Sequence, residues 1–253
     1  MNMKETILQK LAELERSENI KIMYACESGS RAWGFASPDS DFDVRFIYTR
    51  DVNHYLSIAE MPDVVGLPAN EVLDISGWDL KKALKLFLKS NSPLYEWLQS
   101  PIVYSQDNAF ADEIRSLMPA YFSLRSGGNH YLSMANNTLR DDLQGDQVKL
   151  KRYFYALRPA LACQWIVEKQ TVPPMEFDKL RILISDSGVQ KSIDDLVEQK
   201  KDVDEKAFIA PVALLNEWLT NTLNNCRELM PLLPSEKKEA DELNVVFRKY
   251  ILP

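Results

Sequence analysis

Apolar residues follow two different periods along this chain, and the period changes near its middle. Residues 8–14 carry leucines at a three-residue spacing among charged neighbours, which predicts a short amphipathic helix. A mostly apolar run at residues 20–26 and a second run at residues 41–48 predict two strands. The helical period then dominates to the C-terminus. The pattern predicts an α+β protein with two domains, residues 1–106 holding the strands and residues 107–253 all helical.

The stretch after the second strand predicts further elements of the first domain. Residues 71–75 form a third apolar strand candidate that contains an acid. Ser76 and Asp79 have the spacing of a helix capping box. The remaining expected elements are a helix with Leu80, Ala83, Leu84, Phe87 and Leu88 on its apolar face, a short helix at Leu94–Gln99 and a strand at Ile102–Tyr104.

Composition narrows the class of protein. The chain has 253 residues, 45% of them hydrophobic, and a net charge of −7, so any nucleic acid would have to be held by a local patch. Cys26, Cys163 and Cys226 lie far apart without metal-site spacing, and we expect buried thiols in a reducing cytosol. The N-terminal residues lack the apolar core of a signal peptide, and no run reaches membrane-spanning length. We expect a soluble cytoplasmic protein without a membrane partner; its oligomeric state stays open.

The chemistry concentrates in a Gly-Ser turn and a pair of acids that follows it. Gly29 and Ser30 end the first predicted strand, and backbone N–H groups at such a turn can hold phosphate oxygens. Asp41 and Asp43 alternate on the second predicted strand, so both side chains project from one face about 7 Å apart. Two carboxylates at that spacing can share a pair of divalent cations. The combination predicts phosphoryl or nucleotidyl transfer.

A third acid and two arginines extend this element. Asp74 lies inside an apolar strand pattern and is expected to complete an oxygen-rich site of the kind that Mg²⁺ prefers, or to act as a general base. An acid at the edge of the sheet is the alternative for Asp74. Arg31 directly after the turn could fork onto a phosphate, and an ion pair with Asp39 is nearly as plausible. Arg45 shares the face of the acid pair and would balance its charge.

The helical half offers one candidate surface. Lys151, Tyr155 and Arg158 recur at positions i, i+4 and i+7, beside an apolar stripe on the same predicted helix. Two cations and an aromatic ring could hold a triphosphate and stack a base, and a solvated basic face is the alternative. Pro159 is expected to kink this helix.

Two further features carry less chemistry. Arg125 and His130 have the spacing of some helical ribonuclease sites, but the two glycines between them argue against the continuous helix that such a site needs. We therefore expect His130 to be an ordinary helix residue that lines a cleft between the two predicted domains. The lysines between residues 81 and 89 are interpreted as a solvated face, with nucleic-acid contact as the lesser alternative.

Residues 27–45 together resemble the nucleotidyltransferase superfamily of DNA polymerase beta, and more closely its members named for an RNA repair pathway. The stretches at residues 74–82, 130–135 and 151–159 are similar to the same group, so the resemblance covers roughly residues 20 to 180. It implies a small mixed sheet backed by helices, followed by a helical domain across a nucleotide cleft.

The resemblance also implies an activity and a set of residue roles. Gly29 and Ser30 would bind triphosphate, Asp41 and Asp43 would bind magnesium, and Asp74 matches a third carboxylate position. The expected reaction is metal-dependent transfer of an NMP from an NTP, taken to be ATP, to a hydroxyl, with an RNA end as acceptor in RNA repair. Mn²⁺ could replace Mg²⁺ at the two-metal site.

Two other functions stay open from the sequence. The acidic net charge suits a protein or small-molecule acceptor, as in AMPylation, equally well. A catalytically silent nucleotide-binding or toxin–antitoxin partner module is the alternative from another class, and the presence of all three acids argues against it. Base preference and the role of the last 60 or so residues are not indicated.

Overall fold

The computed structural model describes residues 2–59, 61–70, 72–202 and 207–252, and the chain forms two compact units. The first unit comprises Met1–Ala32, Asp41–Tyr121 and Lys237–Pro253, and the second comprises Trp33–Ser40 and Phe122–Glu236. The predicted domain boundary at residue 106 falls inside the first unit, because the helix that follows it packs on the sheet. The short segment 33–40, between the Gly-Ser turn and the acids, belongs to the second unit.

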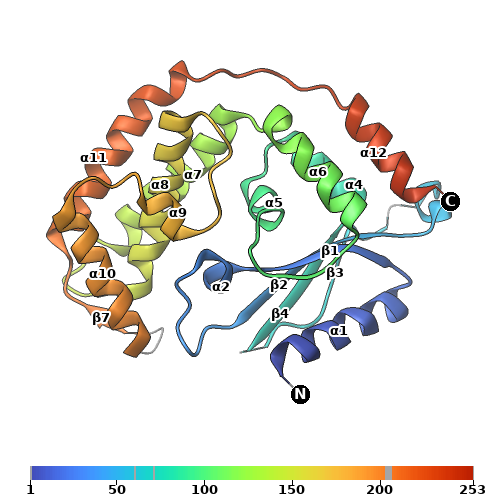
Figure 1. Ribbon diagram of the computed structural model, residues 1–253, viewed down its shortest axis with the longest axis horizontal. Coiled ribbons are helices and arrows are strands. Elements are labelled where there is room, and N and C mark those ends of the chain that lie inside the picture. The colour runs from blue at the N-terminus through green and yellow to red at the C-terminus, as the bar shows by residue number, and fades with distance from the viewer. Residues whose placement is uncertain (1, 60, 71, 203–206, 253) are drawn as a thin grey trace. The chain divides into compact units, whose positions relative to one another are not determined.

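A five-stranded mixed sheet forms the centre of the first unit (Figure 1). Its order is β3-β4-β2-β1-β5, with β2 and β4 parallel and the other pairs antiparallel. The predicted α+β class is therefore confirmed. The strands are β1 (Lys21–Ser28), β2 (Phe42–Thr49), β3 (Val64–Gly66), β4 (Leu73–Asp79) and β5 (Val103–Gln106).

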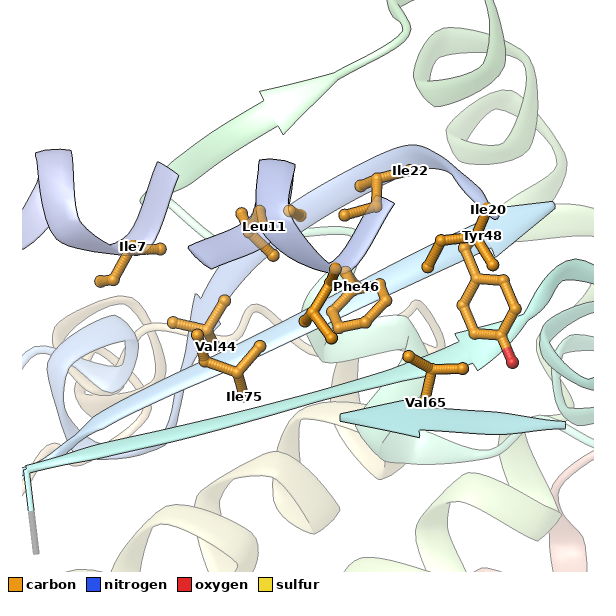
Figure 2. Packing of buried hydrophobic residues seen from close by; sticks show 11 residues of the cluster. Ile7, Leu11, Ile20, Ile22, Val44, Phe46, Tyr48, Val65 and Ile75 are labelled. Atoms are coloured by element: carbon orange, nitrogen blue, oxygen red, sulfur yellow. The ribbon is translucent and has the colours of Figure 1, made fainter. Parts of the chain in front are cut away.

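The sheet buries one face against the first helix. Figure 2 shows Ile7 and Leu11 of α1 (Met3–Glu18) above Val44, Phe46 and the neighbouring apolar side chains of the sheet. The alternation of β2 sends these side chains to the α1 face and leaves the residues between them on the other face. Full burial of each such side chain contributes roughly 1.5–3 kcal/mol, which fixes the register of β2.

Among the described residues, six other helices belong to the first unit, and Figure 1 shows α4 and α5 on the side of the sheet opposite α1. The ring of Trp97 in α5 lies 3.9 Å from the ring of Trp78 in β4, centroid to centroid, and so holds α5 on this face. The six helices are α2 (Gly29–Trp33), which ends in the second unit, α3 (Val52–Tyr55), α4 (Leu80–Leu88), α5 (Ser92–Trp97), α6 (Asn108–Tyr121) and α12 (Asp241–Ile251).

The predicted capping box at Ser76 and Asp79 is wrong. Strand β4 continues through Ser76 because the parallel pairing with β2 extends to Asp79. Asp79 is itself the N-cap of α4, and its Oδ1 accepts a hydrogen bond of 2.8 Å from the N–H of Lys81. The third strand is thus longer than the sequence indicated. Glu71, at the predicted start of that strand, lies outside the described residues.

Where the structure describes it, the second unit is helical apart from one two-stranded ribbon. Helix α7 runs unbroken through Gly127 and Gly128, so the expectation of an interrupted helix there is wrong. A side chain at either position would collide with Phe122 or Met230, so the glycines permit close packing. The elements are α7 (Leu124–Asp142), β6 (Val148–Lys149), α8 (Leu150–Lys169), α9 (Phe177–Arg181), α10 (Ser187–Asp202), β7 (Phe208–Ile209), α11 (Ala213–Leu229) and the 3-10 helix η1 (Met230–Leu232).

Two expectations about the chain as a whole can be compared with the structure. Cys26, Cys163 and Cys226 are free and buried, as predicted. Across the described residues, every helix is either too short or too polar to cross a membrane.

Candidate functional site

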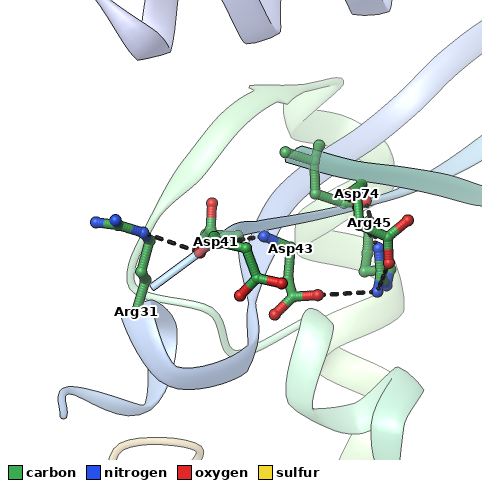
Figure 3. A network of polar contacts seen from close by, with 7 residues as sticks. Arg31, Asp41, Asp43, Arg45 and Asp74 are labelled. Atoms are coloured by element: carbon green, nitrogen blue, oxygen red, sulfur yellow. Dashed lines mark hydrogen bonds and ion pairs between the residues drawn. The ribbon is translucent and has the colours of Figure 1, made fainter. Parts of the chain in front are cut away.

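The three predicted acids all lie in the first unit, at the N-terminal ends of β2 and β4. Because these strands are parallel and in register, Asp43 lies directly opposite Asp74. Asp41 comes two residues before Asp43, just ahead of the first residue of β2. Figure 3 shows the carboxylates of Asp41 and Asp43 on the same side of the strand, as the alternation predicted.

Arg45 lies between two of the acids. Its Nη2 is 3.1 Å from Oδ1 of Asp43 and 2.7 Å from Oδ2 of Asp74, and its Nη1 donates to the main-chain oxygen of Asp74 at 3.2 Å. The prediction that Arg45 shares the face of the acids and balances their charge is confirmed (Figure 3). These ion pairs are half-buried, which favours a fixed geometry over the free rotation of surface charges.

The Gly-Ser turn presses against Asp43. Gly29 has a φ of +62°, which favours glycine, and it begins α2. A Cβ at this position would lie 2.1 Å from Oδ2 of Asp43, closer than any real contact. The carboxylate of Asp43 therefore occupies the space that any side chain at residue 29 would need. Ser30, the next residue, is largely buried at 9% exposure.

Glu27 is a polar residue of this site that the sequence argument missed. It is fully buried in β1, its Oε1 accepts a hydrogen bond of 2.8 Å from the N–H of Asp43, and its Oε2 accepts one from the hydroxyl of Tyr104. Burial raises the pKa of Glu27 above its ordinary value, although both hydrogen bonds oppose that shift. An acid inside an apolar strand was the signal that singled out Asp74, and the same signal is present at Glu27.

Arg31 contacts the start of β2. Its Nε donates to the main-chain oxygen of Asp41 at 3.0 Å, and its guanidinium lies over the ring of Phe42, 3.8 Å from the centroid. These contacts fix Arg31 beside the acid pair, where a guanidinium could meet a phosphate. Its role as a phosphate ligand stays a prediction.

The three residues predicted on the helical half all lie on α8. Arg158 is buried at 3% exposure, donates from Nε to the main-chain oxygen of Met175 at 3.0 Å and lies over the Trp33 ring at 4.6 Å. Tyr155 meets the same Trp33 edge to face at 5.7 Å. Lys151 is half-buried one turn earlier. Tyr155 and Arg158 thus share one face of the helix, while nucleotide binding by all three stays a prediction.

The donor set can be tested for its fit to a divalent cation. All three acids supply carboxylate oxygens, which suit Mg²⁺. Among the residues described by the structure, no three acidic, histidine or cysteine side chains are close enough together to hold a metal. Figure 3 shows the carboxylates of Asp41 and Asp43 on one side of the strand, whereas Arg45 pairs with both Asp43 and Asp74 and lies between these two carboxylates. The fit is therefore better for the pair than for all three acids.

Comparison with known proteins decides the family. Residues 3–249 match RlaP, the RNA repair pathway DNA polymerase beta family. The chain belongs to this family. The RlaP match runs through both compact units, so it extends well past the roughly 160 residues in which the sequence resemblance lay.

Two individual proteins are similar to this RlaP member. The protein YcgL of Bacillus subtilis (strain 168) is 43% identical over 244 residues, which cover 96% of this chain and 94% of YcgL. A solved nucleotidyltransferase-like protein from Exiguobacterium sibiricum 255-15 aligns with 91% of this chain and 75% of its own, at 11% identity and a TM-score of 0.33. The structural similarity is too low to carry an argument, and the family rests on the sequence match.

Proposed function

We propose that this RlaP member is a metal-dependent nucleotidyltransferase that moves an NMP from an NTP, ATP by expectation, to a hydroxyl acceptor. The observation that supports it most is the contact of Gly29 with Asp43, because it places a backbone turn suited to phosphate directly against a carboxylate suited to magnesium. A turn and an acid with unrelated structural roles would have no need of this proximity.

In this proposal Asp41 and Asp43 hold two divalent cations, Mg²⁺ with Mn²⁺ as a substitute. When bound, the cations neutralise the charge of the triphosphate and lower the pKa of the attacking hydroxyl. The backbone N–H groups of Gly29 and Ser30, with Arg31, hold the phosphate oxygens. Lys151, Tyr155 and Arg158 are proposed as further nucleotide contacts.

The proposed reaction is a single displacement at the α-phosphorus. The acceptor oxygen forms a bond to that phosphorus while the bond to the β-phosphate oxygen breaks, and pyrophosphate leaves. Asp74, oriented by Arg45 at 2.7 Å, is the carboxylate proposed to take the hydroxyl proton or to serve as a third metal ligand.

The acceptor proposed is an RNA end, in keeping with the RNA repair pathway for which the family is named. Protein or small-molecule nucleotidylation, and a silent nucleotide-binding module, are alternative outcomes of the test. We place the reaction in the cytoplasm.

The test uses the full chain with α-labelled NTPs and magnesium, against separate RNA, protein and small-molecule fractions. The proposal expects label in the RNA fraction at the 3′ end, released pyrophosphate and dependence on magnesium. Label found only in the protein or small-molecule fraction would identify that fraction, and not RNA, as the source of the acceptor. No label in any fraction, with NTP still bound, would favour the silent module.

A further inference from the structure

A cavity of about 330 Å³ opens in the first unit where α3, the segment before β3 and the start of α4 meet. Its lining includes His54 and Tyr55 of α3 and Lys81, Lys82 and Lys85 of α4. None of these residues belongs to the acid cluster. The cavity therefore lies apart from the residues to which the transfer chemistry is assigned.

The charges in this cavity leave positive charge available to a ligand. Lys82 is paired with Asp63 at 2.8 Å, and Asp79 accepts hydrogen bonds from Tyr55 and from the N–H of Lys81. In the described part of the chain, the ammonium groups of Lys81 and Lys85 have no acidic partner. Among the described residues, both acids of the lining are thus engaged, while Lys81 and Lys85 are exposed and have no acidic partner.

The lining of the cavity also includes two exposed apolar side chains. Ile58 is fully exposed, and Met61 is 52% exposed. An occupant of matching chemistry carries anionic groups on one side and flat apolar surface on the other, as a single nucleic-acid strand does.

The strand β4 connects the cavity with the acids. Asp74 lies near its start and Asp79, at the cavity, is its last residue. Five residues at about 3.3 Å each separate them by about 17 Å along the strand. Because they are an odd number of residues apart, the side chains of Asp74 and Asp79 project from opposite faces of the sheet, so this length is a lower bound for the path of a nucleic-acid strand. At about 3.4 Å per stacked nucleotide, the path takes at least about five nucleotides.

We propose that this cavity is a binding site for the acceptor strand, in which Lys81 and Lys85 hold backbone phosphates of single-stranded RNA a few nucleotides from its reacting end. Ile58 and Met61 contact the bases. The acidic net charge of the chain then poses no obstacle, because the strand is held by a local cationic wall. The inference rests on the proposed function for the identity of the strand, and it takes up nucleic-acid contact, the lesser alternative that the sequence left open for these lysines.

The test measures the binding of a fluorescent single-stranded RNA of about twelve nucleotides by anisotropy, over a series of salt concentrations. The variant Lys81→Gln/Lys85→Gln is compared with the matched control Lys4→Gln/Lys89→Gln, which removes two exposed charges outside the cavity. The cavity variant is expected to lose at least about tenfold in affinity. Its salt slope should fall in magnitude by about 1.4, since each neutralised phosphate of a single strand contributes about 0.7. The control should stay within about twofold of the wild type.

Two companion measurements separate this site from the nucleotide site. Ile58→Ser should weaken RNA binding with an unchanged salt slope, because it removes contact with bases and not with phosphates. Binding of ATP with magnesium to the lysine variant should match that of the wild type. Equal losses in the cavity variant and its control, or an ATP loss as large as the RNA loss, would overturn the site. RNA binding is measured without NTP, so a protein that binds RNA here and transfers nothing fails only the proposed function.

Discussion

Gly29 carries a constraint imposed by Asp43 rather than by the fold of the turn alone. The nearest atoms to a Cβ at Gly29 are all atoms of the Asp43 side chain. A side chain can rotate away at moderate cost, so the fold would survive a substitution here while the carboxylate would leave its position. At Gly29, an effect on activity can therefore be separated from an effect on stability.

Gly29→Ala should abolish magnesium-dependent nucleotide transfer while the protein stays folded. The positive φ costs about 1–2 kcal/mol with an alanine, and the collision with Oδ2 of Asp43 displaces the metal ligand. Gly34→Ala is a matched control, because Gly34 also has a positive φ, +95°, but a Cβ there meets nothing within 4 Å. Thermal unfolding and labelled transfer are measured on both. Similar activity in the two variants would contradict the role of the Gly29–Asp43 contact.

Glu27→Ala should destabilise the protein by about 2–4 kcal/mol, because the Tyr104 hydroxyl and the Asp43 N–H both lose their buried acceptor. Tyr104→Phe removes one hydrogen bond and should cost about 1 kcal/mol. Urea unfolding gives the free energy of each variant. If Glu27→Ala is no less stable than Tyr104→Phe, the carboxylate does not organise this end of β2.

At the scale of elements, Asp79 joins the end of β4 to the beginning of α4. It is 4% exposed and accepts hydrogen bonds from the N–H of Lys81 and, at 2.8 Å, from the hydroxyl of Tyr55. Burial raises its pKa above the ordinary value, and its two hydrogen bonds only partly offset that effect. The folded state therefore binds the proton of Asp79 more tightly than the unfolded state does.

This pKa shift predicts a stability change with a definite sign. The contribution of Asp79 is fully present below its unfolded pKa of about 3.8 and is lost as the pH rises through its higher folded value. Asp79→Asn, which keeps a capping oxygen but cannot ionise, should therefore gain stability relative to the wild type as the pH is raised from about 3.5 toward 7. Urea unfolding across this range is the measurement, with the exposed Asp112→Asn as control. If the stability of Asp79→Asn relative to the wild type stays constant or falls as the pH rises, then ionisation of Asp79 does not destabilise the folded state.

The elements could be predicted from the sequence where one local signal dominated. Strand β2 and the acids on it follow from alternation, and the pairing of Asp43 with Asp74 follows once β2 and β4 are parallel neighbours. Strand β3 could not be predicted, because three residues carry no period and depend on pairing with β4. Helix α7 is continuous despite the low helix propensity of Gly127 and Gly128. Its packing contacts at these positions outweigh the cost of a glycine inside a helix, which is about 1 kcal/mol each.

At the scale of the whole molecule, local patterns failed to show which segments pack together across long stretches of sequence. Helix α12 belongs to the first unit, where Tyr250 donates to Glu113 at 2.6 Å, although more than a hundred residues separate them. Residues 33–40 join the second unit, where the ring of Phe35 stacks on that of Phe154 at 4.8 Å. Both contacts join segments that are far apart in the sequence, and the periodicity within either segment does not predict them.

The assignment of Asp41 and Asp43 to the metal and nucleotide site is tested by comparing acid variants in one transfer assay. Full-length wild type, Asp41→Asn, Asp43→Asn and the control Asp39→Asn are incubated with α-labelled ATP, magnesium and an RNA acceptor, and label in the RNA is followed over time. The control changes an acid of the same loop that is assigned no role in the chemistry. We predict that Asp41→Asn and Asp43→Asn lose at least about 100-fold in the rate of transfer, with unchanged unfolding temperatures, while Asp39→Asn keeps its activity. Transfer at the wild-type rate by either Asp41→Asn or Asp43→Asn would contradict the assignment of these two carboxylates to the metal and nucleotide site.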